Sequence, residues 1–136
     1  MKTALHFGVA VLIVAISGCA SPPTTQELAL ADYGPAPKNY KVTVTAHMQM
    51  LLKDPDSARY GFYIEPVKGY AGRQRVFGWA TCVMINAKNS FGGYTGAQQY
   101  FFLIRNDKIV FYDATDGRNV LSDNRINQSC ATLQPA

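Results

Sequence analysis

Two segments of the chain, residues 75–87 and 98–105, alternate regularly and are apolar on both of their faces. One face of the first segment carries Phe77, Trp79, Val83 and Ile85, and its other face carries Gly78, Ala80, Cys82 and Met84. The second segment alternates Tyr100, Phe102 and Ile104 with Phe101 and Leu103. Such alternation is typical of β-strands, and a strand that is apolar on both faces has to be covered on both sides. We therefore expect both strands to lie in the centre of a sheet.

A short amphipathic helix is expected before these strands. Four apolar residues fall at helical spacing, namely Val44, Met48, Leu51 and Leu52. Either Thr43 or Thr45 can cap the start of this helix. Asp54-Pro55 predicts its end, because the residue before a proline is pushed out of the helical region.

Weaker patterns predict the remaining elements. Residues 59–65 alternate as a strand, and the proline and glycines of 66–74 predict a loop. Asn106-Asp107 predicts a tight hairpin turn into a further strand over 108–113. The tail over 122–130 favours a short terminal helix. Together these elements predict an α+β domain in which one N-terminal helix packs on a curled antiparallel sheet of about four strands.

The N-terminus has the layout of an export signal. Lys2 precedes an apolar run from Ala4 to Ile16 that contains no carboxylate or lysine. The run has about 13 residues, which is short of the ~20 that a membrane-spanning helix needs. The stretch Ile16-Ser17-Gly18-Cys19 follows, and it resembles the signal of bacterial lipoprotein precursors. This resemblance implies that residues 1–18 are a signal peptide and that cleavage occurs before Cys19.

The resemblance also implies that Cys19 is the lipid attachment site. Its thiol would carry a diacylglycerol, and its new α-amine would carry an acyl chain such as palmitate. These three lipid chains are more than the two membrane-binding signals that stable anchoring requires. Ala20 stands where an aspartate would imply retention at the inner membrane, so the outer membrane, facing the periplasm, is favoured. The alternative is an ordinary secretory signal in which Cys19 is incidental.

The chain after the signal is long enough for one domain. Residues 19–41 are predicted to be a linker, because they contain four prolines, at positions 22, 23, 35 and 37. Such a segment is extended or disordered and would hold the domain off the lipid surface. Residues 42–136 are predicted to form a single α+β domain.

With Cys19 committed to lipid, two cysteines remain, Cys82 and Cys130. The cell envelope is an oxidising compartment, and two thiols allow only one intramolecular pair. We expect a disulfide that ties the C-terminal helix or tail to the sheet. Two buried free thiols are the alternative.

Charge and composition narrow the set of partners. The formal net charge is +4, the cations form no stripe, and an envelope location excludes nucleic acid. An envelope protein or a cell-wall polymer is the expected partner besides the membrane. We expect no cofactor and no metal, since the Asp113–Gly117 turn lacks the ligands of a calcium loop. His47 is interpreted as a core or boundary histidine.

The most unusual stretch of the mature chain is the segment 86–96. It contains three glycines, and its candidate binding residues are Lys88, Asn89, Ser90 and Tyr94. A phosphate-binding loop is excluded, because such a loop opens a helix, whereas a strand follows here. Either the segment is a hairpin connection whose glycines supply positive φ, or it is a polar binding loop.

Two stretches together support a second resemblance. Lys53-Asp54-Pro55-Asp56-Ser57-Ala58, with Cys82 and the 86–96 segment, is similar to a pattern found in small, mostly uncharacterised bacterial exported proteins. The chain departs from that pattern at Val83, where the group often has glycine. The resemblance supports the fold and implies no activity.

These observations favour a non-enzymatic envelope lipoprotein that acts as a binding or structural module through the 86–96 loop. A periplasmic enzyme inhibitor or a small hydrolase is the alternative. A cleft with converging carboxylates or with His47 would favour an enzyme, and a protruding loop would favour an inhibitor or adaptor.

Overall fold

The computed structural model describes residues 21–72 and 75–133. Within these ranges the chain forms α1 (Thr25–Leu30), α2 (Tyr40–Gln49), β1 (Asp54–Phe62), β2 (Val67–Ala71), β3 (Val76–Lys88), β4 (Gln98–Arg105), β5 (Lys108–Ala114) and α3 (Val120–Thr132). The strands form one antiparallel sheet in the order β1-β3-β4-β5, and β2 also pairs with β3. The predicted α+β class and the central position of β3 and β4 are confirmed.

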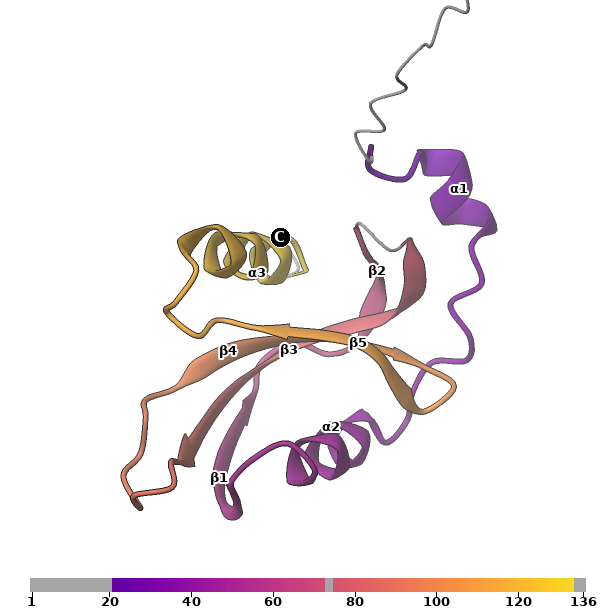
Figure 1. The fold of residues 1–136 in the computed structure, drawn as a ribbon. Coiled ribbons are helices and arrows are strands. Elements are labelled where there is room, and N and C mark those ends of the chain that lie inside the picture. Colours follow the sequence, from indigo (N-terminus) through magenta and orange to yellow (C-terminus); the bar gives the residue numbers. More distant parts are fainter. Residues whose placement is uncertain (1–20, 73–74, 134–136) are drawn as a thin grey trace, which may run out of the picture.

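The sheet lies between two helices, with α2 on one face and α3 on the other (Figure 1). Each face has its own apolar core. The core under α2 is built by Tyr40, Val44, Met48, Val83, Ile85, Phe102 and Ile104. The core under α3 is built by Ile64, Ala71, Ala80, Cys82, Phe101, Leu103, Ile126 and Cys130. The double-sided apolar pattern of β3 and β4 therefore has a direct cause, since each strand supplies side chains to both cores.

The hairpin between β4 and β5 forms as predicted. Asn106 and Asp107 have φ values of 51° and 56°, the left-handed conformation that a two-residue hairpin turn requires at both positions. The predicted terminal helix is also present as α3, which begins after Asn119. The Asn119 side chain accepts hydrogen bonds from the backbone N–H groups of Leu121 and Ser122, which is the arrangement of a helix N-cap.

The prediction of a loop over 66–74 is wrong for residues 67–71, which form β2. The misleading residue is Gly69, because glycine within a short segment favours a turn. In the structure a Cβ atom on Gly69 would lie 2.6 Å from the Cβ of Ala80. Glycine is therefore needed here for the close approach of two strands. The sheet has five strands instead of about four.

β1 and β2 share one edge of the long strand β3. Phe62 of β1 lies opposite Val83, whereas Val67 of β2 lies opposite Ala80. The chain turns a corner between them, and there the hydroxyl of the fully buried Thr81 donates a hydrogen bond to the carbonyl of Ile64 at 2.6 Å. This bond satisfies a polar group that would otherwise be costly to bury.

The helix before β1 starts and ends earlier than predicted. α2 begins at Tyr40 because this ring is buried and its hydroxyl donates to Glu65 at 2.9 Å. Burial and this contact raise the pKa of Tyr40 to about 12. Neither Thr43 nor Thr45 caps the helix, since both hydroxyls bond back to carbonyls of the preceding turn.

The strand expected over 59–65 also begins earlier, at Asp54, and ends at Phe62. Pro55 therefore lies within β1 and does not end a helix. This is tolerated because β1 pairs with β3 on one side only, so an edge position needs no N–H from the proline. Ile64 belongs to the core under α3, whereas the sequence places it on the same face as Tyr60 and Phe62.

The proline-bearing segment contains α1, which the sequence does not predict as a stable element. Thr24 and Glu27 form a reciprocal capping box at its start, and Arg75 pairs with Glu27 at 2.7 Å. After α1 the chain packs against the sheet. Tyr33 is buried, and the indole N–H of Trp79 donates to the carbonyl of Gly34 at 3.0 Å.

Residues 1–20 lie outside the described residues, and with them the predicted signal peptide and Cys19. In the part of the chain that the structure describes, none of the helices has the length and apolar character to cross a membrane.

Candidate functional site

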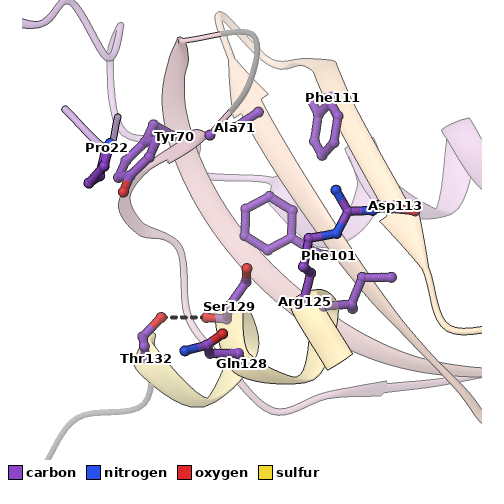
Figure 2. Close-up of a pocket in the computed structure, with 12 residues that line it drawn as sticks. Pro22, Tyr70, Ala71, Phe101, Phe111, Asp113, Arg125, Gln128, Ser129 and Thr132 are labelled. Atoms are coloured by element: carbon purple, nitrogen blue, oxygen red, sulfur yellow. Dashed lines mark hydrogen bonds between the residues drawn. The ribbon is translucent and has the colours of Figure 1, made fainter. Parts of the chain in front are cut away.

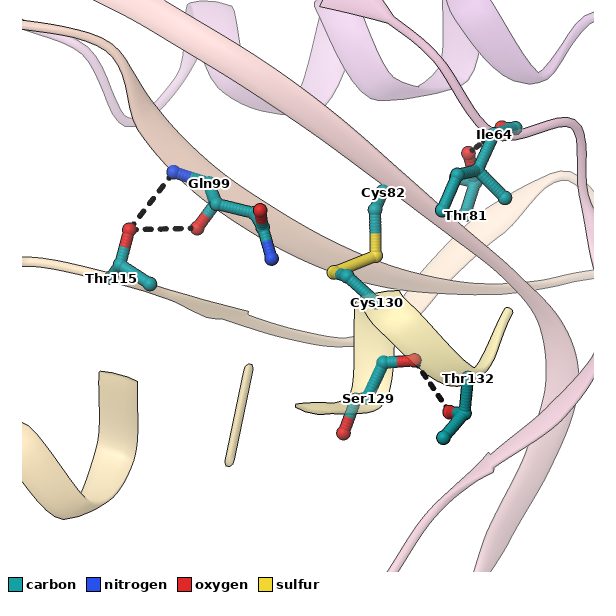
Figure 3. The surroundings of a disulfide bond; sticks show 8 residues. All are labelled: Ile64, Thr81, Cys82, Gln99, Thr115, Ser129, Cys130 and Thr132. Carbon is teal, nitrogen blue, oxygen red and sulfur yellow. Dashed lines mark hydrogen bonds between the residues drawn. A yellow bond between two sulfur atoms is a disulfide. The ribbon is translucent and has the colours of Figure 1, made fainter. Parts of the chain in front are cut away.

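The predicted pair of cysteines forms a disulfide that joins β3 to α3 (Figure 3). The Cα atoms of Cys82 and Cys130 are 5.9 Å apart, and both side chains are almost completely buried, with 0% and 2% exposure. The two cysteines are part of the core under α3. The disulfide therefore fixes the position of α3 on the sheet.

The 86–96 loop connects β3 to β4, and Asn89 holds its backbone in shape. The Oδ1 atom of Asn89 accepts hydrogen bonds from the N–H groups of Phe91, at 2.9 Å, and Gly93, at 3.1 Å. The backbone N–H of Asn89 also donates to the Gly93 carbonyl at 2.8 Å. Gly92 has a φ of +80°, a conformation that glycine adopts readily. Asn89 therefore supports the loop from within.

Tyr94 folds back from this loop onto β1. Its hydroxyl donates to the carbonyl of Ser57 at 3.2 Å. Two cations lie near its ring, since the guanidinium carbon of Arg59 is 4.6 Å and the Nζ of Lys88 is 5.6 Å from the ring centroid. These distances are in the range of cation–π contacts. Tyr94 and Lys88 thus anchor the base of the loop.

Ser57 connects the two stretches that carry the second resemblance. Its Oγ accepts a hydrogen bond from the Lys88 N–H at 3.1 Å and donates to the Asp54 carbonyl at 2.8 Å. Its own N–H donates to the Asp54 side chain at 3.3 Å. The structure therefore brings the 53–58 turn and the 86–96 loop together at one end of the sheet.

The tip of the loop presents Ser90 and Phe91 to solvent. Phe91 is 95% exposed, whereas the backbone around it is held by the bonds to Asn89. Tyr94 is 40% exposed. Of the four predicted loop residues, three shape the loop or its base, and only Ser90 lies free at its tip.

The surface next to the loop is basic. A cleft of about 400 Å³ is lined by Leu51, Leu52, Lys53, Ile85, Ala87, Lys88, Thr95, Gln98, Tyr100 and Arg118. This lining includes three cationic side chains and no carboxylate. Arg118 lies 3.8 Å from Asp116; this pair is largely exposed and therefore weak. Arg59 on β1 also lies at this end of the molecule, and so does the carboxylate of Asp54, which lies opposite Lys88 in the sheet.

A larger cleft of about 680 Å³ lies between α3 and the sheet (Figure 2). We call it the α3 cleft. Its floor is apolar and includes Ala71, Phe101, Phe111 and Ile126. Its polar lining includes Tyr70, Asp113, Arg125, Gln128, Ser129 and Thr132, and Pro22 and Gly72 complete the lining. Asp113 is the one carboxylate among these lining residues.

His47 lies on the opposite face of the sheet from the α3 cleft. Its ring packs edge-on against Tyr112 at 4.9 Å and against Phe102 at 6.4 Å. Burial lowers the pKa of His47, and within the described ranges its Nε2 has no hydrogen-bond partner. The structure does not bring His47 together with Asp113. In residues 21–72 and 75–133, no three His, Cys, Asp or Glu side chains are grouped to hold a metal ion.

Sequence reasoning missed the most exposed residue of the loop, Phe91, and the contacts of Ser57 and Arg59. The sequence does carry a signal for Phe91, since a phenylalanine that is flanked by glycines and polar residues belongs to no apolar face of a strand or helix. The contacts of Ser57 arise only when β1 pairs with β3. The α3 cleft was missed as well, because its lining comes from five separate parts of the chain.

No protein-family model, no curated protein sequence and no solved structure matches this chain.

Proposed function

We propose that the chain is a lipid-anchored envelope protein of bacteria that binds a protein partner through the tip of the 86–96 loop. The observation that carries this proposal is Phe91, which is 95% exposed on a loop whose backbone is held by Asn89. Exposed aromatic side chains are favoured anchors at protein interfaces. A loop that is ordered before binding loses less conformational entropy when it binds.

The charge around the loop defines the expected partner. Three cations, Arg59, Lys88 and Lys53, lie at the base of the loop beside one carboxylate, Asp54. A surface that receives Phe91 in an apolar pocket and carries acidic residues around that pocket would complement this arrangement. With an enzyme whose cleft accepts Phe91 as its partner, the chain is an inhibitor. With any other envelope protein as its partner, the chain is an adaptor.

Anchoring is the second part of the proposal, and it rests on the stretch Ile16-Ser17-Gly18-Cys19. Growth of the native bacterium, or of a bacterial host, with an alkyne-bearing fatty acid should label the mature chain. The variant Cys19→Ala should not be labelled and should accumulate at its precursor size. Equal labelling of both chains would refute lipid attachment at Cys19.

The partner can be tested by site-specific crosslinking in intact cells. A photoreactive amino acid at position 90 should give a discrete product with one envelope protein, and Phe91→Ala should remove most of that product. A photoreactive residue at position 121 is the matched control, because Leu121 is also exposed, at 76%, but lies on α3.

Two results would refute binding through the loop. One is the same set of products from positions 90 and 121, and the other is a position 90 product that Phe91→Ala leaves unchanged. If Arg59→Gln weakens a Phe91-dependent product, the expected acidic character of the partner is supported.

A further inference from the structure

The α3 cleft contains one cationic and one anionic side chain. Arg125 of α3 and Asp113 of β5 both line it, and among the described residues neither takes part in a salt bridge. Among the described arginines, Arg75, Arg105 and Arg118 each pair with a carboxylate, whereas Arg59 and Arg125 do not. The cleft therefore carries one positive and one negative group, on α3 and on β5. Asp113 Oδ1 accepts a hydrogen bond from the Ala114 N–H at 3.0 Å, and the other carboxylate oxygen has no partner among the described residues.

Below these charges the cleft offers apolar surface. Phe101 and Phe111 pack edge to face, with ring centroids 6.2 Å apart, and Ile126 contributes from the helix. In Figure 2 the two rings and the Arg125 side chain border the same space. A volume of about 680 Å³ lies within the ~300–1,000 Å³ that is typical of small-molecule sites.

The helical wall also carries unused hydrogen-bonding groups. The side chains of Gln128 and Ser129 have no hydrogen-bond partner in the described part of the chain, whereas the Thr132 hydroxyl already donates to the Ser129 carbonyl at 2.8 Å. An amide and a hydroxyl can each donate and accept. They suit a ligand that has amide groups between its charged ends.

The wall is held in place before any ligand arrives. Cys130 lies on α3 between the lining residues Ser129 and Thr132, and its disulfide to Cys82 fixes that part of α3 to the sheet. A site that is preformed in this way avoids part of the entropy cost of binding.

From these features we infer that the α3 cleft binds a short apolar peptide with free ends, whose carboxylate contacts Arg125 and whose ammonium contacts Asp113. The apolar side chains of the peptide rest on Phe101, Phe111 and Ile126, and its amide groups face Gln128 and Ser129. This site is independent of the loop tip, which lies at the end of the sheet formed by the β3–β4 connection.

The probe for this inference is the dipeptide leucyl-phenylalanine, titrated into residues 20–136, which contain every described element. Binding is followed through backbone amide resonances in two-dimensional NMR spectra. We expect saturable shifts at the lining residues, with a Kd of about 0.1–1 mM. Three further forms of the same dipeptide separate the contributions of its ends: an N-acetyl form, a C-terminal amide and a doubly blocked form.

Blocking either end should weaken binding roughly fivefold, the upper range for an exposed charge pair. The variant Arg125→Gln should remove the difference between the free acid and the amide, and Asp113→Asn should remove the difference between the free amine and the N-acetyl form. Arg118→Gln is the matched control, since Arg118 lies outside the α3 cleft, and it should change nothing. Dispersed spectra of each variant establish that it is folded.

Three outcomes would overturn the inference. The first is the absence of saturable shifts at the cleft with all four forms. The second is equal affinity for all four forms, or equal affinity of wild type and Arg125→Gln for the free dipeptide. Either result would mean that only apolar contacts contribute to binding. A preference for decanoate over the dipeptide would also overturn it, because the site would then accept an amphipathic acid without an ammonium.

Discussion

Loss of the Cys82–Cys130 disulfide should destabilise the domain strongly. The two cysteines are 48 residues apart in sequence. In the chain-entropy model, a cross-link that closes a loop of this length stabilises the folded state by about 4 kcal/mol. This is a large part of the ~5–15 kcal/mol that is typical of a small domain. The reduced protein should therefore be close to the limit of stability at 37 °C.

The structure also predicts where the loss is felt first. α3 has two buried residues, Ile126 and Cys130, and an isolated helix of this length is marginal in water. Without the cross-link, α3 should open without unfolding of the sheet. Amide hydrogen exchange should then increase over α3 well before it increases over β3 and β4.

Urea unfolding of the oxidised and reduced protein measures the effect. Trp79 is the only tryptophan of the chain, and its fluorescence reports on the sheet. With a slope of about 1.5 kcal/mol per molar urea, the midpoint should fall by roughly 2–3 M on reduction. The double variant C82A/C130A should behave like the reduced wild type. Midpoints that agree within about 0.5 M before and after reduction would refute the reasoning.

Three further changes have defined outcomes. Gly78→Ala should destabilise the protein by about 1–3 kcal/mol, because the added Cβ would lie 2.6 Å from the Ile104 carbonyl oxygen. Gly61→Ala is the control, since a Cβ at this position would make only ordinary contacts. Equal losses of stability for the two variants in urea unfolding would contradict this account. Asn89→Ala removes two hydrogen bonds to loop amides. Hydrogen exchange at those amides should accelerate, while the free energy of unfolding falls by about 1 kcal/mol or less. Unchanged hydrogen exchange would show that the loop is held by other contacts. Burial lowers the pKa of His47 in the folded state below 6.5, so the unfolded chain binds the proton more readily than the folded chain. The free energy of unfolding should therefore fall as the pH drops through about 6.5 and level off below the folded-state pKa. His47→Gln should abolish that part of the pH dependence, and an unchanged profile would exclude His47 as its source.

The parts of the fold that sequence predicts well are those that depend on local pattern. The strands β3 and β4 are recognisable because both of their faces are apolar, and the β4–β5 turn is recognisable because Asn106-Asp107 suits positive φ. The strand β2 was missed because Gly69 has the same appearance in a turn and in a close strand contact. Only the position of Ala80 across the sheet distinguishes the two.

The candidate site was predicted in part for the same reason. The composition of the 86–96 loop drew attention to the correct segment, but the role of each residue depends on partners far away in sequence. Tyr94 bonds to Ser57, and this contact exists only because β1 pairs with β3. The α3 cleft depends on the docking of α3, so nothing in the sequence signals that Arg125 and Asp113 line the same cleft.

The shared edge of β3 has a consequence for how this fold can change in evolution. β1 is aligned by its pairing with one half of β3, and β2 is aligned by its pairing with the other half. Residues 63–66, which lie between β1 and β2, pair with neither half of β3. An insertion beside the exposed Tyr63 would lengthen the corner and leave both alignments intact. An insertion within β3 would instead turn a run of side chains from one core to the other. Length variation among relatives of this chain should therefore concentrate at that corner.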